Sequence, residues 1–439
     1  MKMMKRILAM LLLLNGHYAF SQTEMVWNPN AANGRYTNPV IHADYSDPDA
    51  IRVGDYFYMI ASSFNAVPGL PILQSTDLVN WSLIGYALQK QPPFDVFNKV
   101  QHGNGVWAPS IRYHKNEFYI YYPDPDFGIY LTKAKNILGP WSTPLLINEG
   151  KGLIDPCPLW DDNGKAYLVH AYAGSRAGFK SLIVVKEMNG RGDSIIGKPV
   201  MVFDGQKTDP TIEGPKFYKR NGYYYIFAPA GGVSTGWQLV LRSKNVYGPY
   251  DRKVVMDQGK TAVNGPHQGA WVTSIKGEDW FLHFQDKDAY GRVLHLQPMV
   301  WKNDWPMIGN DADGDSNGEP VSVHQKPAIT KPAPVAVPPT SEEFNAPSLG
   351  LQWQWQANEQ EGWAFTTPNG FLRMNCVKQE EGANNLWMLP NMLLQKFPAE
   401  EFSTITKYDF NPNFVGDKTG LIIFGLDYAY LSLVKKEDG

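Results

Sequence analysis

The sequence predicts an all-β protein: a five-bladed β-propeller followed by a β-sandwich domain. The segment assigned to the sandwich is long enough for half to most of such a domain. Three observations lead to this prediction. The chain of 439 residues combines 14 Trp, 23 Tyr and 21 Phe with 40 Gly and 33 Pro, a mixture of strand formers and turn formers. Helical periodicity is scarce between residues 38 and 305, and within that range one short pattern recurs five times. A chain of this length usually needs more than one hydrophobic core, so two domains are expected.

The N-terminus has the layout of a secretory signal peptide over residues 1–21. Lys2, Lys5 and Arg6 precede the apolar run 7–14, and the segment 19–21 offers small residues before a cut near Gln22. A membrane anchor is the alternative, but the apolar run is far shorter than a bilayer span. We therefore expect an exported protein, periplasmic or secreted.

The recurring pattern predicts the propeller. In each copy, a polar or small residue, often beside Pro, precedes a strand, a Gly/Asn/Asp turn and an aromatic-rich strand, which together predict a β-hairpin. Successive copies lie roughly 50 to 60 residues apart, a spacing that suits four-stranded blades, and they place the propeller at residues 36–325. The copies begin at Ser46-Asp47-Pro48, Trp107-Ala108-Pro109, Asp155-Pro156, Glu213-Gly214-Pro215 and His267-Gln268-Gly269.

The first residues of these copies are expected to share one pocket. In a propeller the innermost strand of each blade starts near the central axis, so matching positions of the repeat converge there. The matching residues are Asp47, Trp107 or a close neighbour, Asp155, Glu213 and His267. The presence of any single one of these residues could be explained by the turn that precedes a strand. All five together favour an axial site that contains three carboxylates.

The region after the propeller predicts a linker and a second β-domain. Residues 326–341 are dense in Pro, which is typical of a semi-rigid linker or a strap between domains. Residues 342–439 alternate apolar and polar side chains between turn signals such as Pro368-Asn369-Gly370. About 100 residues is enough for half to most of a sandwich, so we expect a partial concanavalin-like β-sandwich.

Charge and motifs exclude several classes of protein. A net charge of -3 and a pI near 6.3 provide no field that would favour nucleic acid or an anionic membrane surface. The sequence contains no P-loop, dinucleotide fingerprint, HExxH or GxSxG pattern. The acidic segment 311–315 resembles the start of a calcium loop but lacks the Gly and Glu that an EF-hand requires. Cys157 and Cys376 lie far apart, and two buried free thiols are expected rather than a disulfide.

Three converging carboxylates suit the hydrolysis of a glycosidic bond. One carboxylic acid protonates the leaving oxygen, and a second carboxylate activates water or attacks carbon. A third can keep the acid protonated near neutral pH by like-charge repulsion. Asp47, Asp155 and Glu213 supply these groups from three blades.

Other residues are candidates for contacts to the sugar. Phe64 and Trp107 could form sugar-facing walls, and Arg292 could bind hydroxyl groups and hold a carboxylate ionised, with a surface cation as its alternative. His267 could ligate a metal, bridge to water or be a satisfied core histidine.

At these positions the sequence resembles glycoside hydrolase family 43, the five-bladed propeller β-xylosidases and α-L-arabinofuranosidases. The resemblance rests on Tyr45-Ser46-Asp47-Pro48-Asp49, Ser75-Thr76-Asp77-Leu78-Val79-Asn80-Trp81, Gly105-Val106-Trp107-Ala108-Pro109, Asp155-Pro156 and Glu213-Gly214-Pro215. It implies an inverting mechanism in which Asp47 is the general base, Glu213 the general acid and Asp155 the residue that raises the acid's pKa and orients it. It also implies an appended C-terminal sandwich and a xylan-type oligosaccharide or polysaccharide as substrate. No cofactor is required, although a structural calcium ion on the propeller axis, held in part by His267, is one implication.

The sequence departs from the family pattern near two of the motifs. Asp49 stands where Ser is frequent, and Lys216 stands where His is frequent, so neither departure touches a catalytic carboxylate. The primary expectation is a β-1,4-xylosidase that releases xylose from xylo-oligosaccharides or hemicellulose. The alternatives are an α-L-arabinofuranosidase, a retaining glycosidase of a related propeller family, and a sugar-binding propeller that has lost catalysis.

Overall fold

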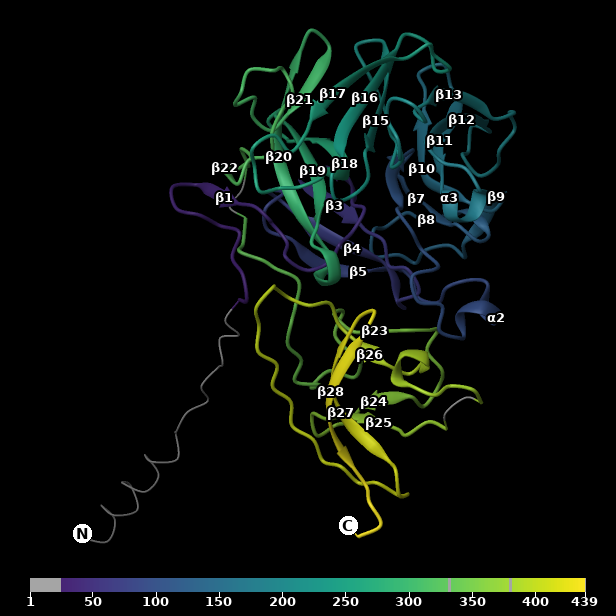
Figure 1. Ribbon diagram of the computed structural model, residues 1–439, viewed down its shortest axis with the longest axis vertical. Coiled ribbons are helices and arrows are strands. Elements are labelled where there is room, and N and C mark those ends of the chain that lie inside the picture. Colours follow the sequence, from purple (N-terminus) through teal and green to yellow (C-terminus); the bar gives the residue numbers. More distant parts are fainter. Residues whose placement is uncertain (1–24, 331–332, 379–380, 439) are drawn as a thin grey trace, which may run out of the picture.

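A computed structural model describes residues 25–330, 333–378 and 381–438, and almost all of its regular structure is β-strand. Twenty strands form five four-stranded antiparallel sheets, each made from one continuous stretch of chain (Figure 1). The inner strands of the first four sheets contact one another in turn. Strand β18 of the fifth sheet contacts β15 of the fourth and β2 of the first, so the sheets close into a ring. The predicted five-bladed propeller is confirmed.

Each blade runs from an inner to an outer strand in chain order. Blade 1 holds β2 (Asp49–Val53), β3 (Tyr56–Ile60), β4 (Gly69–Ser75) and β5 (Ser82–Leu88). Blade 2 holds β6 (Ser110–His114), β7 (Glu117–Asp124), β8 (Gly128–Ala134) and β9 (Leu145–Glu149). Blade 3 holds β10 (Leu153–Trp160), β11 (Ala166–Tyr172), β12 (Leu182–Met188) and β13 (Val200–Asp204). Blade 4 holds β14 (Lys216–Arg220), β15 (Tyr223–Ala230), β16 (Trp237–Ser243) and β17 (Asp251–Met256). Blade 5 holds β18 (His267–Thr273), β19 (Asp279–Asp286), β20 (Arg292–Lys302) and β21 (Trp305–Ile308).

The hairpins that the repeat predicts are formed by turns with left-handed residues. Asn221 and Gly222 join β14 to β15 with φ of 49° and 71°, and Lys115 and Asn116 join β6 to β7 with φ of 50° and 61°. Two successive positive φ values twist a two-residue turn in the sense that matches the flanking strands. Asn and Gly accept this conformation readily, which explains why the turn signals of the sequence locate the hairpins correctly.

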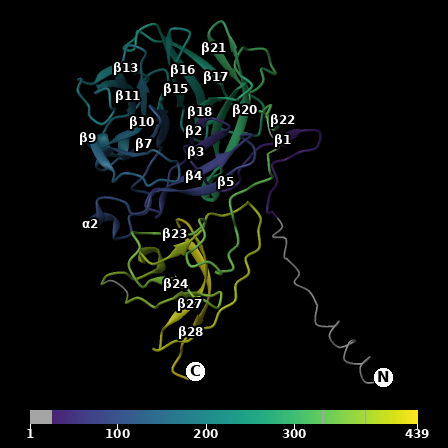
Figure 2. The same ribbon diagram turned by 180° about the vertical axis from the view of Figure 1, so that it is seen from behind.

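The ring is closed by a short segment that precedes the first blade. Strand β1 (Arg35–Thr37) pairs with β22 (Val323–Gln325), which follows the fifth blade. The side chain of Asn38 donates to the carbonyl oxygens of Leu296 and Val321, both at 2.8 Å, and accepts from the Leu296 amide at 2.9 Å. These bonds join the two ends of the propeller sequence, as the proximity of β1 and β22 in Figures 1 and 2 also shows.

The region after β22 begins as an extended strap and ends as a small β-region. The Ala328 amide bonds Glu278 at 2.8 Å and the Ala336 amide bonds Asn80 at 3.3 Å, so the predicted linker lies along the propeller. The strands that follow form three two-stranded sheets: β23 (Gln354–Trp355) with β26 (Leu393–Leu394), β24 (Ala364–Thr366) with β25 (Leu372–Met374), and β27 (Lys418–Phe424) with β28 (Tyr428–Val434).

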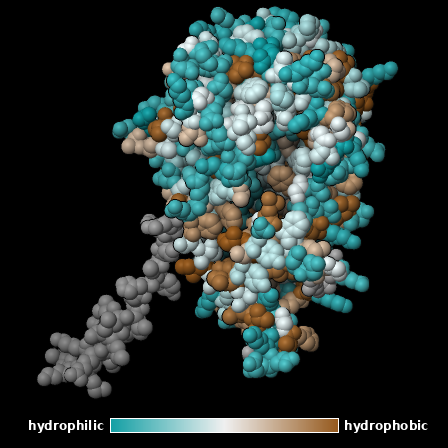
Figure 3. Space-filling view, viewed as in Figure 1, coloured by the Kyte–Doolittle hydropathy of each residue, from teal (hydrophilic) through white to brown (hydrophobic). Residues whose placement is uncertain are grey.

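The C-terminal region contacts the propeller through β23 and the residues around it, among other places, and exposes many apolar side chains. The Trp355 amide and carbonyl pair with Val67 just before β4, at 2.6 and 2.9 Å. Much of the β27–β28 hairpin is open to solvent, with Leu431 81% and Leu433 51% exposed, and Figure 3 shows apolar residues gathered over this part of the molecule. In a β-sandwich, one face of such a hairpin packs against a second sheet.

Helices are few and short in the described residues. They are α2 (Phe94–Phe97), α3 (Gly174–Ala177) and the 3-10 turns η1 (Asp288–Tyr290) and η2 (Leu386–Met388). Among these described elements, none is a helix long and apolar enough to span a bilayer. The predicted signal peptide, residues 1–21, lies outside the described residues. Cys157 and Cys376 are both free, as predicted, but Cys376 is exposed, so the prediction that both are buried is wrong for that residue.

Candidate active site

The predicted axial residues lie at kinks where the inner strands begin. Asp47 and Asp155 adopt left-handed backbone conformations with φ of 54° and 55°. Gly214 at 58° and Gln268 at 36°, the residues that directly follow Glu213 and His267, do the same in blades 4 and 5. Left-handed conformations cost energy for residues other than Gly and concentrate at functional sites. The same kink therefore recurs in four blades.

Asp47 is held at both carboxylate oxygens. Arg292, the first residue of β20 in blade 5, donates from Nη1 to Oδ1 at 2.7 Å, and Ser62 donates from Oγ to Oδ2 at 2.6 Å. Asp47 is buried, whereas the Arg292 side chain is 27% exposed. The arginine pairs with a carboxylate and is therefore not a simple surface cation. Two donors therefore fix the orientation of the carboxylate: Ser62 from the same blade and Arg292 from the neighbouring blade 5.

Glu213 is bonded to the histidine of the next blade. Its Oε1 lies 3.1 Å from Nε2 of His267, which is the first residue of β18 and is 1% exposed. The Glu213 side chain is 26% exposed, so the carboxyl group can reach a ligand in the pocket. Gly214, the next residue, has no room for a side chain, because a Cβ there would lie 2.8 Å from the side chain of Gln268.

Asp155 lies behind Glu213 and is 4% exposed. Its Oδ2 accepts a hydrogen bond of 2.7 Å from the amide of Gly214. Burial raises the pKa of Asp155 to about 7, and the negative charges of Glu213 and Asp47 add to this effect, while the Gly214 amide and Lys216 oppose it. The charges of Asp47 and Glu213 also act on Arg292. The structure thus brings the three predicted carboxylates together.

A cavity of about 350 Å³ opens beside Glu213 and is lined by Trp107, Tyr172, Lys180 and Thr211, among others. The Trp107 indole donates to the Gly103 carbonyl at 2.8 Å, and the guanidinium of Arg176 lies 5.4 Å from its ring. Trp107 is therefore placed as a wall of this cavity. Phe64 is not among the residues that line it. Its backbone instead pairs with Val106, next to Trp107.

His267 is the residue to which the family resemblance assigns a calcium ion on the propeller axis. Its Nε2 lies 3.1 Å from Oε1 of Glu213, and its buried Nδ1 has no hydrogen-bond partner among the described residues. One free ring nitrogen is compatible with a water molecule or an ion, so the axial calcium ion stays a prediction.

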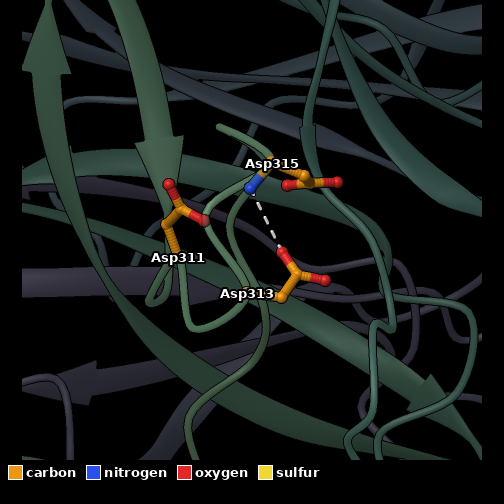
Figure 4. A group of neighbouring side chains, drawn as sticks. All are labelled: Asp311, Asp313 and Asp315. Carbon is orange, nitrogen blue, oxygen red and sulfur yellow. Dashed lines mark hydrogen bonds between the residues drawn. The ribbon is translucent and has the colours of Figure 1, made fainter.

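Elsewhere, three exposed or half-exposed aspartates cluster in the loop after β21, with ligand atoms within 4.8 Å of one another (Figure 4). Their carboxylates accept hydrogen bonds from amides within the loop: Asp311 from Gly314 at 2.8 Å and Asp313 from Asp315 at 3.3 Å. Turn formation accounts for this cluster, and it lies apart from the three carboxylates of the repeat.

Three contacts escaped the sequence analysis. Ser62 has no motif of its own, since it simply follows β3. The bond from His267 to Glu213 joins positions 54 residues apart, and Arg176 reaches Trp107 from the short helix α3. The sequence indicated one of these contacts in part: the repeat places His267 and Glu213 at matching positions, so the two residues were expected to lie near each other.

Comparison with known proteins identifies the group to which these features belong. The family model described as glycosyl hydrolases family 43 matches residues 36–306. The chain belongs to glycosyl hydrolase family 43. A second family model, the beta xylosidase C-terminal concanavalin A-like domain, matches residues 341–439.

Individual relatives of this family 43 glycosidase carry two kinds of name. A putative beta-xylosidase of Xylanibacter ruminicola is 42% identical over 92% of this chain and 73% of its own. A non-reducing end alpha-L-arabinofuranosidase of Bacteroides ovatus is 29% identical over 99% of this chain and 81% of its own. Among solved structures, a family 43 protein of Bacillus licheniformis superposes with a TM-score of 0.75 at 25% identity, covering 92% of this chain and 80% of that one.

Proposed function

We propose that this glycosidase is an inverting, exo-acting β-1,4-xylosidase that releases xylose from xylo-oligosaccharides or hemicellulose. The observation that carries the proposal is a group of three neighbouring carboxylates, each with a different set of partners. The similarity to relatives named as beta-xylosidases supports the choice of sugar.

In this mechanism Asp47 and Glu213 act on opposite faces of the sugar. Asp47, fixed by Arg292 and Ser62, removes a proton from the attacking water. Glu213 protonates the leaving oxygen, and the cavity beside it accommodates the leaving sugar. An inverting enzyme holds these two carboxyl groups about 6.5–9.5 Å apart, which leaves room for the water.

Asp155 supports the acid without touching the substrate. Because burial and the nearby charges of Glu213 and Asp47 raise the pKa of Asp155 to about 7, the Asp155–Glu213 pair retains a proton near neutrality. The Gly214 amide bonds Asp155 and opposes this rise without cancelling it. In the proposed mechanism Asp155 orients the acid through the Gly214 backbone, and Glu213 delivers a proton to the leaving oxygen.

An α-L-arabinofuranosidase is the second candidate, because a relative of that name matches nearly the whole chain. Both sugars are pentoses with similar hydroxyl groups. Rates on an aryl β-xyloside and an aryl α-L-arabinofuranoside separate the two candidates, and a higher kcat/KM on the arabinofuranoside would reverse the assignment. Proton NMR of the first-formed sugar tests inversion, since a retaining enzyme releases the opposite anomer.

Glu213→Gln tests the catalytic assignment. The amide keeps the shape of the side chain but has no acidic proton, so turnover of an oligosaccharide should fall by about 10²- to 10⁴-fold. Binding of xylo-oligosaccharide, measured by calorimetry, should persist. Unchanged turnover would exclude Glu213 as the acid, and a wild-type protein that binds sugar without turnover would indicate a silent sugar-binding propeller.

We also propose that catalysis needs no cofactor and that the chain is exported. The acid and base are both side chains, which supports the first proposal, and the charge and hydropathy of residues 1–21 support the second. Activity that survives dialysis against a chelator, and an extracytoplasmic product that begins near Gln22, are the expected results.

A further inference from the structure

A group of buried charged and polar side chains crosses the propeller next to the catalytic carboxylates. Its members come two or three residues after the repeat positions, further along each inner strand. Asp49 lies two residues after Asp47 in blade 1, and Lys216 lies three residues after Glu213 in blade 4. The corresponding residues of blades 2 and 3 are Ser110 and Cys157, and all four are buried. We call Asp49, Arg112 and Lys216, with these polar neighbours, the axial ion layer.

Lys216 joins three blades. Its side chain is fully buried, and its Nζ donates to the Pro109 carbonyl at 2.9 Å and to Ser110 Oγ at 2.8 Å. The same Nζ lies 4.0 Å from Oδ2 of Asp49. The first residue of β14 is thus tied to β2 and to the start of β6.

Arg112 completes the connection to the remaining catalytic strand. Its Nη1 donates to Oδ2 of Asp49 at 2.7 Å, and its Nη2 lies 2.7 Å from Sγ of Cys157 on β10. The amide of Phe217 on β14 also donates to this sulfur, at 3.2 Å. Four inner strands that carry or follow Asp47, Trp107, Asp155 and Glu213 are therefore cross-linked by polar contacts.

The charges of the layer do not cancel. Two cations, Lys216 and Arg112, face one carboxylate, Asp49. Burying an ammonium group costs several kcal/mol unless other groups compensate for the lost water, and apolar residues of similar size would often serve stability equally well. Part of this positive charge, that of Lys216, acts on Asp155 and opposes the effect of the neighbouring carboxylates Glu213 and Asp47.

We propose that the axial ion layer is a positioning device for hydrolysis, which sets the spacing of Asp47, Asp155 and Glu213 and supplies a positive charge next to them. The inference rests on the proposed roles of these three carboxylates. Lys216 does not touch substrate and acts through Asp155 and through the strands.

The effect of this charge on pH dependence has a definite sign. The groups that act on Asp155 are Glu213 and Asp47, which raise its pKa, and Lys216 and the Gly214 amide, which lower it. Loss of the Lys216 charge removes one of the two opposing influences. The Asp155–Glu213 pair would then keep its proton to higher pH, and the alkaline limb of the rate profile would move upward.

Lys216→Gln tests the inference, with Lys219→Gln as the matched control. Gln can still donate a hydrogen bond but carries no charge, whereas Lys219 lies on the same strand and pairs with Asp161 and Asp162 outside the layer. For Lys216→Gln we expect kcat to fall roughly 10- to 100-fold with KM little changed, since small displacements of reacting groups have effects of this size. The alkaline limb should rise by roughly one pH unit, and Lys219→Gln should leave both readouts unchanged.

Asp49→Asn tests the same layer with the opposite sign if Lys216→Gln does not fold. It removes the anion and leaves both cations, so the alkaline limb should move to lower pH. A pH profile that stays in place in a folded variant of either kind would overturn the inference, even if activity fell. All rates are taken relative to wild type on whichever aryl glycoside the enzyme cleaves, and Glu213→Gln tests the catalytic roles separately.

Discussion

Replacing Ser62 with Ala removes one of the two hydrogen bonds that hold the proposed general base. Ser62 is 1% exposed, and its Oγ donates to Oδ2 of Asp47 at 2.6 Å. The backbone bond from the Ser62 amide to the Ser46 carbonyl, at 3.0 Å, does not depend on the side chain. The substitution therefore changes one contact of Asp47, and the bond to Arg292 remains.

The size of the effect follows from the charge on the acceptor. A hydrogen bond to a charged group contributes about 1.5–3 kcal/mol, and roughly 1.4 kcal/mol corresponds to a tenfold change in rate. If the bond is needed to orient Asp47 in the transition state, kcat/KM for Ser62→Ala should fall about 10- to 150-fold. KM should change less than kcat, because Ser62 is buried behind the carboxylate.

Ser63→Ala is the matched control for this experiment. Ser63 is the next residue, is also buried, and its Oγ accepts a bond of 3.1 Å from the Leu70 amide without contacting Asp47. Both variants lose one buried hydrogen bond, so their unfolding temperatures should fall by similar amounts. The assay is initial-rate kinetics on an aryl xyloside at a temperature where both are folded. Equal loss of kcat/KM in the two variants would refute the proposed role of Ser62.

Three further substitutions test other parts of the structure. Burial raises the pKa of Asp124 to about 7, and its Oδ2 has no hydrogen-bond partner among the described residues, so the stability of the native protein should fall as pH rises from about 4 to 7. Asp124→Asn should therefore raise the free energy of unfolding by a few kcal/mol at pH 8 and little at pH 4. An equal effect at both pH values would contradict this. Burial lowers the pKa of His283 to about 4, so the stability of the native protein should fall as pH drops from about 6.5 to 4. In His283→Gln, the free energy of unfolding measured with urea should depend less on pH over this range, by up to 1.4 kcal/mol per pH unit. An unchanged pH dependence would show that this histidine is not buried in its uncharged form. Trp355 is 3% exposed and packs on Trp363, so Trp355→Ala should destabilise the C-terminal region by about 3–5 kcal/mol. In calorimetry, this region should then unfold at a lower temperature than in the wild type. A single transition at an unchanged temperature would contradict the packing.

Much of the propeller could be predicted because its information is local and repeated. Turn pairs such as Asn221-Gly222 and aromatic-rich strands are short-range signals, and five copies made the architecture recognisable. The C-terminal region has no such repetition. Its alternation predicted strands, and the described residues of this region form three strand pairs, with β27 and β28 largely exposed.

The residues of the candidate site could be predicted from the sequence, but the hydrogen bonds between them could not. Repeat register located Asp47, Asp155 and Glu213, because equivalent positions of a propeller meet near its axis. It could not show that His267 bonds Glu213, since a histidine at that position is equally suited to a metal or to the core. Cys376 was misjudged for a related reason: burial depends on neighbours from distant segments, and here the chain leaves it exposed.

The sequence by itself determined the five blades, the hairpin turns and the three carboxylates, because each depends on patterns within a few residues and on their repetition. Only the tertiary structure decided the partners of those carboxylates. Ser62 and Arg292 reach Asp47 over separations of 15 and 245 residues, and Lys216 reaches Ser110 over 106. Contacts of this kind arise when closure of the ring brings separate strands together, and no local pattern encodes them.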